Sequence, residues 1–326
     1  MSYSFAIRTL GTSAILRQEL ESLHRQTIKP DRIIVYIAEG YERPTYTVGV
    51  EEYQWVPKGM VRQRVLRYED IDSEYIFFLD DDVILAPNAA ETLLNEAVAH
   101  SADCIAPDTF RTHEMSFGSK VYAILTNLVF PRTNDNWAFK RNRNGSMSYN
   151  NNPSTGFYLS QTCDGPAWLC KKDVFLSLHL EDEVWLDRLG FPYGEDALET
   201  YKFYVNGYKV GVIYGDLAMH LDAKSSSGDY HKNSRKFYVR SFATFTLWWR
   251  MIYDNPNLPA LERFYSCILF IIKVLWLLPI NICASIAFRN IKIPYYYTKG
   301  VIDGWIFLHS NEYKKIPPYV LRDRKC

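Results

Sequence analysis

Three consecutive aspartates, Asp80, Asp81 and Asp82, directly follow the apolar run 75–79. That run has the length and composition of a buried strand. Carboxylates packed side by side repel one another, and a divalent cation offsets this repulsion because hard cations prefer oxygen ligands. In parallel α/β sheets, ligands bind at the carboxyl ends of the strands. The triplet therefore predicts a metal or ligand site, with a solvated acidic turn as the alternative.

Two other segments place reactive groups at the ends of expected elements. Glu195 and Asp196 open a predicted helix over 195–205, where the helix macrodipole stabilises carboxylates, and Asp196 can act as a general base toward a hydroxyl group. His220 follows a strand candidate at 208–214, and neutral imidazole is a competent ligand beside a carboxylate metal site. Ordinary roles stay open for both segments: helix-terminal acids in the first, and a surface or core histidine in the second.

The N-terminal part of the chain has a strand–helix–strand pattern that can position these groups. A strand is predicted over 3–7, and Leu16, Leu20 and Leu23 then repeat at helical spacing. Residues 32–38 form a β-rich run. This order indicates a βαβ unit and hence a parallel sheet.

The stretch 132–165 has a different character from its surroundings. It is rich in Asn, Ser, Gly and Arg and has little hydrophobic periodicity. Long segments without structure of their own are uncommon inside compact domains and are usually functional. We therefore predict a long loop here that orders over a bound ligand.

The composition narrows the class of protein. Of 326 residues, 48% are hydrophobic, which is enough for a substantial core. Lys plus Arg equals Asp plus Glu at 37 each, so the net charge offers no whole-chain argument for nucleic acid. The six cysteines form no CxxC pair, and the N-terminal residues lack a basic stretch followed by a long apolar run. Both features lead us to expect reduced thiols in a cytoplasmic protein.

Four segments, taken in their order along the chain, resemble a known family. They are 26–35 (Gln-Thr-Ile-Lys-Pro-Asp-Arg-Ile-Ile-Val), Arg64 followed by 74–82 (Glu-Tyr-Ile-Phe-Phe-Leu-Asp-Asp-Asp), 165–172 (Gly-Pro-Ala-Trp-Leu-Cys-Lys-Lys) and Glu195-Asp196. Over about residues 3–225 the sequence resembles the inverting nucleotide-sugar glycosyltransferases of family 2, which adopt the GT-A fold. The sequence departs from the family pattern at Arg8-Thr9-Leu10 and at Glu39, where the family has an aspartate.

The resemblance implies a role for each motif residue. Asp196 would be the catalytic base, and Mn²⁺ or Mg²⁺ would be the cofactor. The expected metal-binding residues are Asp82, Asp80 and His220. The expected nucleotide-sugar-binding residues are Thr9, Glu39, Arg64, Asp80 and Asp81. The acceptor side would contain Gly165, Trp168 and Glu195.

The C-terminal third contains an almost wholly apolar run, 264–288, that is long enough to span a bilayer. Lys273 and Pro279 interrupt it and favour a broken pair of helices at a membrane interface, flanked by Arg289 and Lys292, which suit anionic headgroups. A single membrane span, a buried helix and a dimer face remain as alternatives.

Together these observations predict an α/β fold of the GT-A type: a Rossmann-like mixed sheet flanked by helices, with a mostly helical, apolar C-terminal extension. We expect a glycosyltransferase domain over 1–230 and the extension over 231–326. The expected partners are a nucleotide-sugar donor, a carbohydrate or lipid-linked acceptor and a membrane surface, without nucleic acid. The expected location is the inner face of the cytoplasmic membrane, and the expected role is cell-envelope or surface polysaccharide assembly. The alternatives are a nucleotidyltransferase and a non-catalytic sugar-binding protein on the same scaffold.

Overall fold

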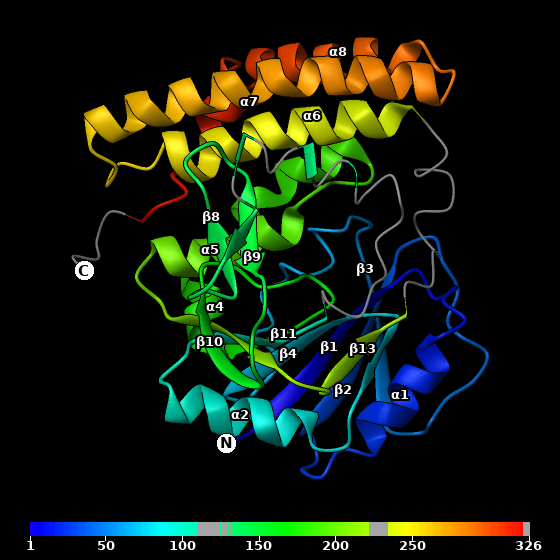
Figure 1. The fold of residues 1–326 in the computed structure, drawn as a ribbon. Helices are drawn as coiled ribbons and strands as arrows, with labels where there is room; N and C mark the ends of the chain where they lie inside the picture. Colours follow the sequence, from blue (N-terminus) through cyan, green and yellow to red (C-terminus); the bar gives the residue numbers. More distant parts are fainter. Residues whose placement is uncertain (110–120, 122–123, 126–128, 131, 222–233, 322–326) are drawn as a thin grey trace.

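A large mixed sheet forms the centre of the computed structural model, which describes residues 1–109, 121, 124–125, 129–130, 132–221 and 234–321 (Figure 1). Its eight strands lie in the order β10-β12-β6-β11-β4-β1-β2-β3. In chain order their bounds are β1 Tyr3–Thr9, β2 Arg32–Ala38, β3 Glu51–Val56, β4 Tyr75–Asp80, β6 Cys104–Pro107, β10 Gly156–Ser160, β11 Ala167–Lys171 and β12 Val210–Tyr214.

The N-terminal half of the sheet is parallel, as the strand–helix–strand pattern predicts. Strand β1 lies between β2 and β4, runs parallel to both, and is buried along its whole length. Strands with both faces covered read as continuous apolar runs, which explains why β1, β2 and β4 are so rich in aliphatic and aromatic residues. The register pairs Arg8 of β1 with Asp80 of β4, so both strands end at the same edge.

Helices cover both faces of the sheet. Helices α1 (Leu16–His24) and α2 (Ala89–Ala99) share one cluster of buried residues with one face of β1, and α4 (Lys172–Ser177) and α5 (Glu195–Val205) share another cluster with the opposite face. Strand β11 runs antiparallel between β4 and β6, which makes the sheet mixed. This layout confirms the predicted mixed sheet flanked by helices.

The expectation of a structureless loop over 132–165 is wrong. The segment contains β7 (Thr133–Asn134), β8 (Phe139–Arg141) and β9 (Met147–Asn150), which form a small three-stranded sheet, and it then forms edge strand β10. These strands are short, and turn residues such as Asn142 and Gly145 separate them. Strands of so few residues leave no periodicity for sequence analysis to detect.

A helical layer follows, confirming the predicted helical C-terminal region. Helix α6 (Arg235–Trp248) continues into the π-helical turn η2 (Trp249–Tyr253), and α7 (Ala260–Ala287) and α8 (Lys292–Leu308) lie beyond α6, at the far side of the molecule from α1 and α2 (Figure 1). Glycine permits the close approach of α8 to α6, since a Cβ at Gly300 would lie 2.5 Å from the Tyr238 carbonyl oxygen.

Helix α7 is continuous, so the expected break in this region is wrong. Pro279 lies inside the helix and removes a backbone donor without ending it. Among the described residues, α7 is the helix that is long and apolar enough to cross a membrane, with 22% of its most apolar window buried. The expected boundary between residues 230 and 231 lies outside the described residues.

A buried ion network ties the helical layer to the sheet. Glu183, in the 3-10 helix η1 (Leu180–Leu189), accepts from Lys202 of α5 at 3.1 Å and from Arg250 of η2 at 2.8 Å. All three side chains are almost fully inaccessible to solvent. Burial would raise the pKa of Glu183, but Arg250 and Lys202 outweigh burial and hold the pKa below its ordinary value.

We predict that Glu183→Ala lowers the free energy of unfolding by about 3–5 kcal/mol, because it leaves two buried cations without their counter-ion. Urea denaturation followed by circular dichroism measures this change. The matched control is Glu312→Ala, which removes a surface ion pair to Arg188 and should cost no more than about 1 kcal/mol. Equal losses in the two variants would contradict the assignment of a structural role to the buried network.

Candidate active site

The carboxyl ends of β1 and β4 meet in a cluster of arginine and carboxylate groups. Arg8 donates from Nε to Oδ1 of Asp80 at 2.5 Å and from its terminal nitrogen to Oδ2 at 3.2 Å. Arg64 donates to the same Oδ1 at 2.5 Å. Burial would raise the pKa of Asp80, but the two guanidinium groups outweigh burial and hold the pKa below its ordinary value. Asp80 is therefore an ionised anchor at the sheet edge.

The same two arginines reach the start of α5. Arg8 lies 3.4 Å from a carboxylate oxygen of Glu195, and Arg64 lies 3.5 Å from one of Glu199. Glu195 and Glu199 are one helical turn apart and therefore share a face of α5. These contacts place the first turn of α5, which includes Asp196, against the ends of β1 and β4.

Asp81 faces the loop that follows β1. Thr9 donates from its hydroxyl to Oδ2 of Asp81 at 2.5 Å, and Ser13 donates to the Asp81 carbonyl oxygen at 2.7 Å. Burial raises the pKa of Asp81 to about 7, helped by Asp82 and Asp80 and opposed by the hydrogen bond from Thr9. Asp81 and Thr9, both predicted to contact the nucleotide-sugar, are thus brought together.

A short ribbon brings His220 to Asp82. Strands β5 (Val83–Leu85) and β13 (Ala218–His220) pair antiparallel, with His220 opposite Val83. The His220 Nε2 lies 3.2 Å from Oδ1 of Asp82. Burial would lower the pKa of His220, but Asp82 outweighs burial and raises it. Two residues predicted as metal ligands from distant parts of the sequence are therefore neighbours.

Asp196 lies against Gly165, immediately before β11. A Cβ atom at Gly165 would lie 2.8 Å from the Asp196 Cβ, so glycine is required for this close approach. The neighbouring Asp164 accepts a hydrogen bond from the Thr109 hydroxyl at 2.5 Å, and burial, helped by Asp196, raises its pKa to about 6. Burial and Asp196 likewise raise the pKa of Glu195 to about 7.

Carboxyl groups outnumber cationic groups in this cluster. Eight carboxyl side chains face three guanidinium groups, namely Glu19, Asp80, Asp81, Asp82, Asp164, Glu195, Asp196 and Glu199 against Arg8, Arg64 and Arg141. A bound cation would favour the ionised forms of carboxyl groups that are crowded in this way. Asp82 and His220 offer oxygen and nitrogen donors, although no group of three or more His, Cys, Asp or Glu side chains within the described ranges is arranged to hold a metal.

Two residues occupy positions other than those expected. Trp168 is fully buried on β11, with its ring centroid 4.3 Å from that of Phe78, so it belongs to the core and cannot contact an acceptor. Arg64 is 1% exposed and contacts Asp80 and Glu199, so its side chain is buried behind the sheet edge instead of lying on its surface. Glu39, by contrast, is exposed directly after β2, at the same edge as Thr9.

Three participants are missing from the sequence prediction. Arg8 is a lone cation within a strand that is otherwise almost wholly uncharged, which is the signal that could have found it. Glu199 follows Glu195 at helical spacing, and Asp164 directly precedes Gly165. Each signal was present in the sequence, but none indicates a partner until the strands are placed side by side.

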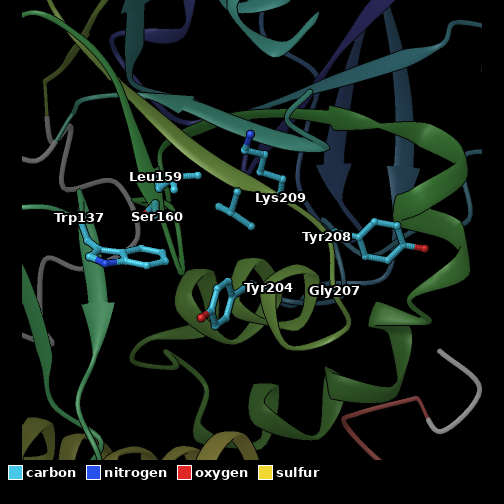
Figure 2. Close-up of a pocket in the computed structure, with 8 residues that line it drawn as sticks. Trp137, Leu159, Ser160, Tyr204, Gly207, Tyr208 and Lys209 are labelled. Atoms are coloured by element: carbon cyan, nitrogen blue, oxygen red, sulfur yellow. The ribbon is translucent and has the colours of Figure 1, made fainter. Parts of the chain in front are cut away.

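A separate pocket of about 230 Å³ lies away from this cluster (Figure 2). It lies at the C-terminal end of α5, whereas Asp196 is at the N-terminal end. Its lining residues are Trp137, Leu159, Ser160, Tyr204, Gly207, Tyr208, Lys209 and Val210. None of these is a charged partner of the carboxylate cluster, so the pocket adds nothing to the candidate active site.

Three solved structures that match this chain are distantly similar to it. S. aureus TarS 1-349 in complex with UDP matches over 83% of this chain and 70% of its own, with 11% identity and a TM-score of 0.49. A longer S. aureus TarS chain matches over 83% of this chain and 43% of its own, with 12% identity and a TM-score of 0.45. GalNAc-T7 with UDP, GalNAc and Mn²⁺ matches over 79% of this chain and 52% of its own, with 12% identity and a TM-score of 0.49. This chain therefore spans about half the length of each of these two. Similarity at this level assigns no substrate or activity. No family model and no curated protein match the sequence.

Glu199 supplies a pH-dependent prediction. Burial outweighs the nearby Arg64 and raises its pKa to about 8, above the ordinary 4.5. Between these values the unfolded chain releases a proton that the folded chain keeps, so this residue's contribution to stability falls as pH rises. We expect the free energy of unfolding of Glu199→Gln to rise, relative to that of wild type, by on the order of 2–4 kcal/mol as the pH goes from about 5 to about 8.5.

Urea denaturation at the two pH values measures this gain. The matched control is Glu69→Gln, whose carboxylate is 75% exposed and should show no pH-dependent difference. A constant difference between Glu199→Gln and wild type across the range would contradict the burial argument.

Proposed function

We propose that this chain is an inverting glycosyltransferase of the GT-A type that transfers a sugar from a nucleotide-diphosphate sugar to an acceptor hydroxyl. The observation that supports it most is the ion network through Arg8, Arg64 and Asp80, which holds Asp196 on α5 beside the end of β4. The order of motifs that resembles family 2 enzymes points the same way. In this proposal the candidate base and the acidic triplet that would face the diphosphate lie at the same edge of the sheet.

The proposed chemistry assigns a distinct task to each side chain. Thr9, Asp81 and Glu39 would orient the nucleoside, because they lie at the ends of β1, β4 and β2. Asp196 would accept the proton of the acceptor hydroxyl as that oxygen attacks the anomeric carbon from the face opposite the leaving diphosphate. A single displacement inverts the anomeric centre, as the analogous carboxylate chemistry does in inverting glycosidases.

A divalent cation, Mn²⁺ or Mg²⁺, is part of the proposal. Asp82 and His220 would hold it, and Mg²⁺ commonly takes only one or two protein ligands together with substrate phosphates. When bound, such an ion stabilises the negative charge that develops on a diphosphate leaving group. The excess of carboxyl groups around Asp81 and Asp164 is consistent with a cation in this position.

The biological setting is also a proposal. The acceptor would be a carbohydrate or a lipid-linked sugar, and the reaction would belong to the assembly of cell-envelope or surface polysaccharide. The chain itself contains the apolar helices α7 and α8, and their composition favours a lipid-linked acceptor. The division into a catalytic unit over 1–230 and a helical extension over 231–326 fits this arrangement.

The first test measures nucleotide release and sugar transfer from a panel of nucleotide-sugars with Mn²⁺ or Mg²⁺. We expect Asp196→Asn to lower the transfer rate by about 10²–10⁴-fold while donor binding by calorimetry persists, because only the base is lost. Asp82→Ala should instead abolish the metal dependence of donor binding. The matched control is Asp72→Asn, a change at an exposed position before β4 that should leave both readouts unchanged.

The outcomes separate the competing functions. Retention of anomeric configuration in the product, read by NMR, would overturn the inverting mechanism. Transfer of a nucleotidyl group to a sugar phosphate would indicate a nucleotidyltransferase. Donor binding that is absent and indifferent to metal would end the glycosyltransferase proposal.

Gly165 offers a second, steric test. Gly165→Ala would place a Cβ 2.8 Å from that of Asp196, so the base must move. Since small misplacements of a catalytic group can cost about 10²-fold, we expect the transfer rate to fall by about 10–100-fold with donor affinity near wild type. Asp72→Asn again serves as the control, because position 72 is exposed. Unaltered transfer by Gly165→Ala would exclude Asp196 as the base.

A further inference from the structure

Helix α7 has its polar residues on the inside and its apolar residues on the outside. Four of the six residues that it buries are polar, the set being Ser266, Phe270, Lys273, Leu277, Asn281 and Ser285. A surface helix of a water-soluble protein normally shows the reverse arrangement, with its apolar stripe toward the core. The amphipathic direction of α7 therefore requires an apolar medium or partner on its outer side.

Specific contacts hold the polar side of α7 against the protein in the N-terminal half of the helix. Ser266 donates to the Arg143 carbonyl oxygen at 2.5 Å, and Lys273 donates to the Asn144 carbonyl oxygen at 3.2 Å. Between them, the Phe270 ring stacks on that of Trp248, the last residue of α6, with ring centroids 4.0 Å apart. These contacts fix which side of the helix faces outward.

The outer side of α7 is lined with large apolar side chains. Leu261, Phe264, Ile271, Leu275 and Ile286 are each exposed by 51–79%. They extend from the first turn of the helix to the last, along about 40 Å at 1.5 Å per residue. An apolar surface this long exceeds the scattered exposure that is normal for monomeric proteins.

Helix α8 continues the same surface. Phe288 and Ile291 in the connection between the helices are exposed, as are Tyr295, Trp305 and Ile306 on α8. Together α7 and α8 form the outermost layer at one end of the molecule (Figure 1). Tyrosine and tryptophan beside aliphatic residues are typical of the boundary between lipid headgroups and acyl chains.

The acids of this layer lie at its ends and are paired: Glu262 in the first turn of α7 with Arg143, and Asp303 of α8 with Lys299. Residues 264–302 contain no Asp or Glu but four cations, Lys273, Arg289, Lys292 and Lys299. Lys273 is buried, whereas Arg289 in the connection between α7 and α8 and Lys292 at the start of α8 are exposed. Cations at the rim of an apolar surface complement anionic lipid headgroups. A second copy of this chain would bring the same cations and no acid from this segment.

We propose that the outer faces of α7 and α8 form a docking surface that lies in the plane of an anionic lipid bilayer. The helix does not cross the bilayer, because Lys273 and Asn281 face the protein and the contacts at Ser266 and Lys273 hold α7 sideways along it. Insertion therefore involves the outer face alone. The inference stands apart from the proposed function, since it uses no residue of the active site.

The test is cosedimentation of the full chain with phosphatidylcholine vesicles, with and without phosphatidylglycerol. We expect stronger binding to the anionic vesicles. Ile271→Glu with Leu275→Glu should weaken it by about tenfold or more, because two inserted side chains become charged. Arg289→Gln with Lys292→Gln should remove about tenfold of the preference for anionic lipid. Val98→Glu, at an equally exposed apolar position on α2, is the matched control.

Further readouts identify the occupant and its depth. Phospholipids brominated on the acyl chain should quench the fluorescence of wild type more than that of Trp305→Phe, and alkaline carbonate should release the protein from vesicles. Retention in carbonate would overturn the in-plane arrangement in favour of a span. Failure to bind either vesicle, together with a lipid-free dimer that Ile271→Glu with Leu275→Glu dissociates, would overturn the lipid assignment in favour of a second copy. If Val98→Glu weakened vesicle binding as much as Ile271→Glu with Leu275→Glu does, the assignment of the docking surface to α7 and α8 would also be overturned.

Discussion

The pairing of Asp80 with two guanidinium groups is the interaction on which the candidate site depends. Asp80 is the last residue of β4, Arg8 lies beside it on β1, and Arg64 approaches from the loop between β3 and β4. The same arginines contact Glu195 and Glu199. Because these contacts are buried, they link the sheet edge to the N-terminal half of α5.

The remaining carboxyl groups acquire their character from this arrangement. Asp81, Asp164 and Glu195 are buried close to other carboxylates, and their pKa values rise to between about 6 and about 7. Titratable groups perturbed by burial and specific charges cluster at functional sites. A cation bound among them would favour their ionised forms, so the electrostatics of the site and its proposed ligand depend on each other.

The helical layer also directs polar side chains toward the interior of the protein. Lys273 reaches the turn between β8 and β9, and Arg250 reaches Glu183 beneath the layer. The layer with the apolar outer surface of α7 and α8 is therefore attached to the small sheet and to η1 through buried hydrogen bonds and an ion pair as well as through packing. A docked surface would accordingly position the whole domain relative to a membrane.

The sequence by itself determined the local elements and the candidate chemistry: the βαβ start, the acidic triplet after a buried strand, the Glu195–Asp196 helix start and an apolar C-terminal helix. Periodicity and composition report which residues are apolar and where a strand or helix ends, because these follow from short-range geometry. Only the tertiary structure decided that Arg64 lies behind Asp80, that Trp168 is core and that His220 reaches Asp82. Those outcomes depend on which strands are neighbours, and such long-range pairings leave no periodic signal in the chain.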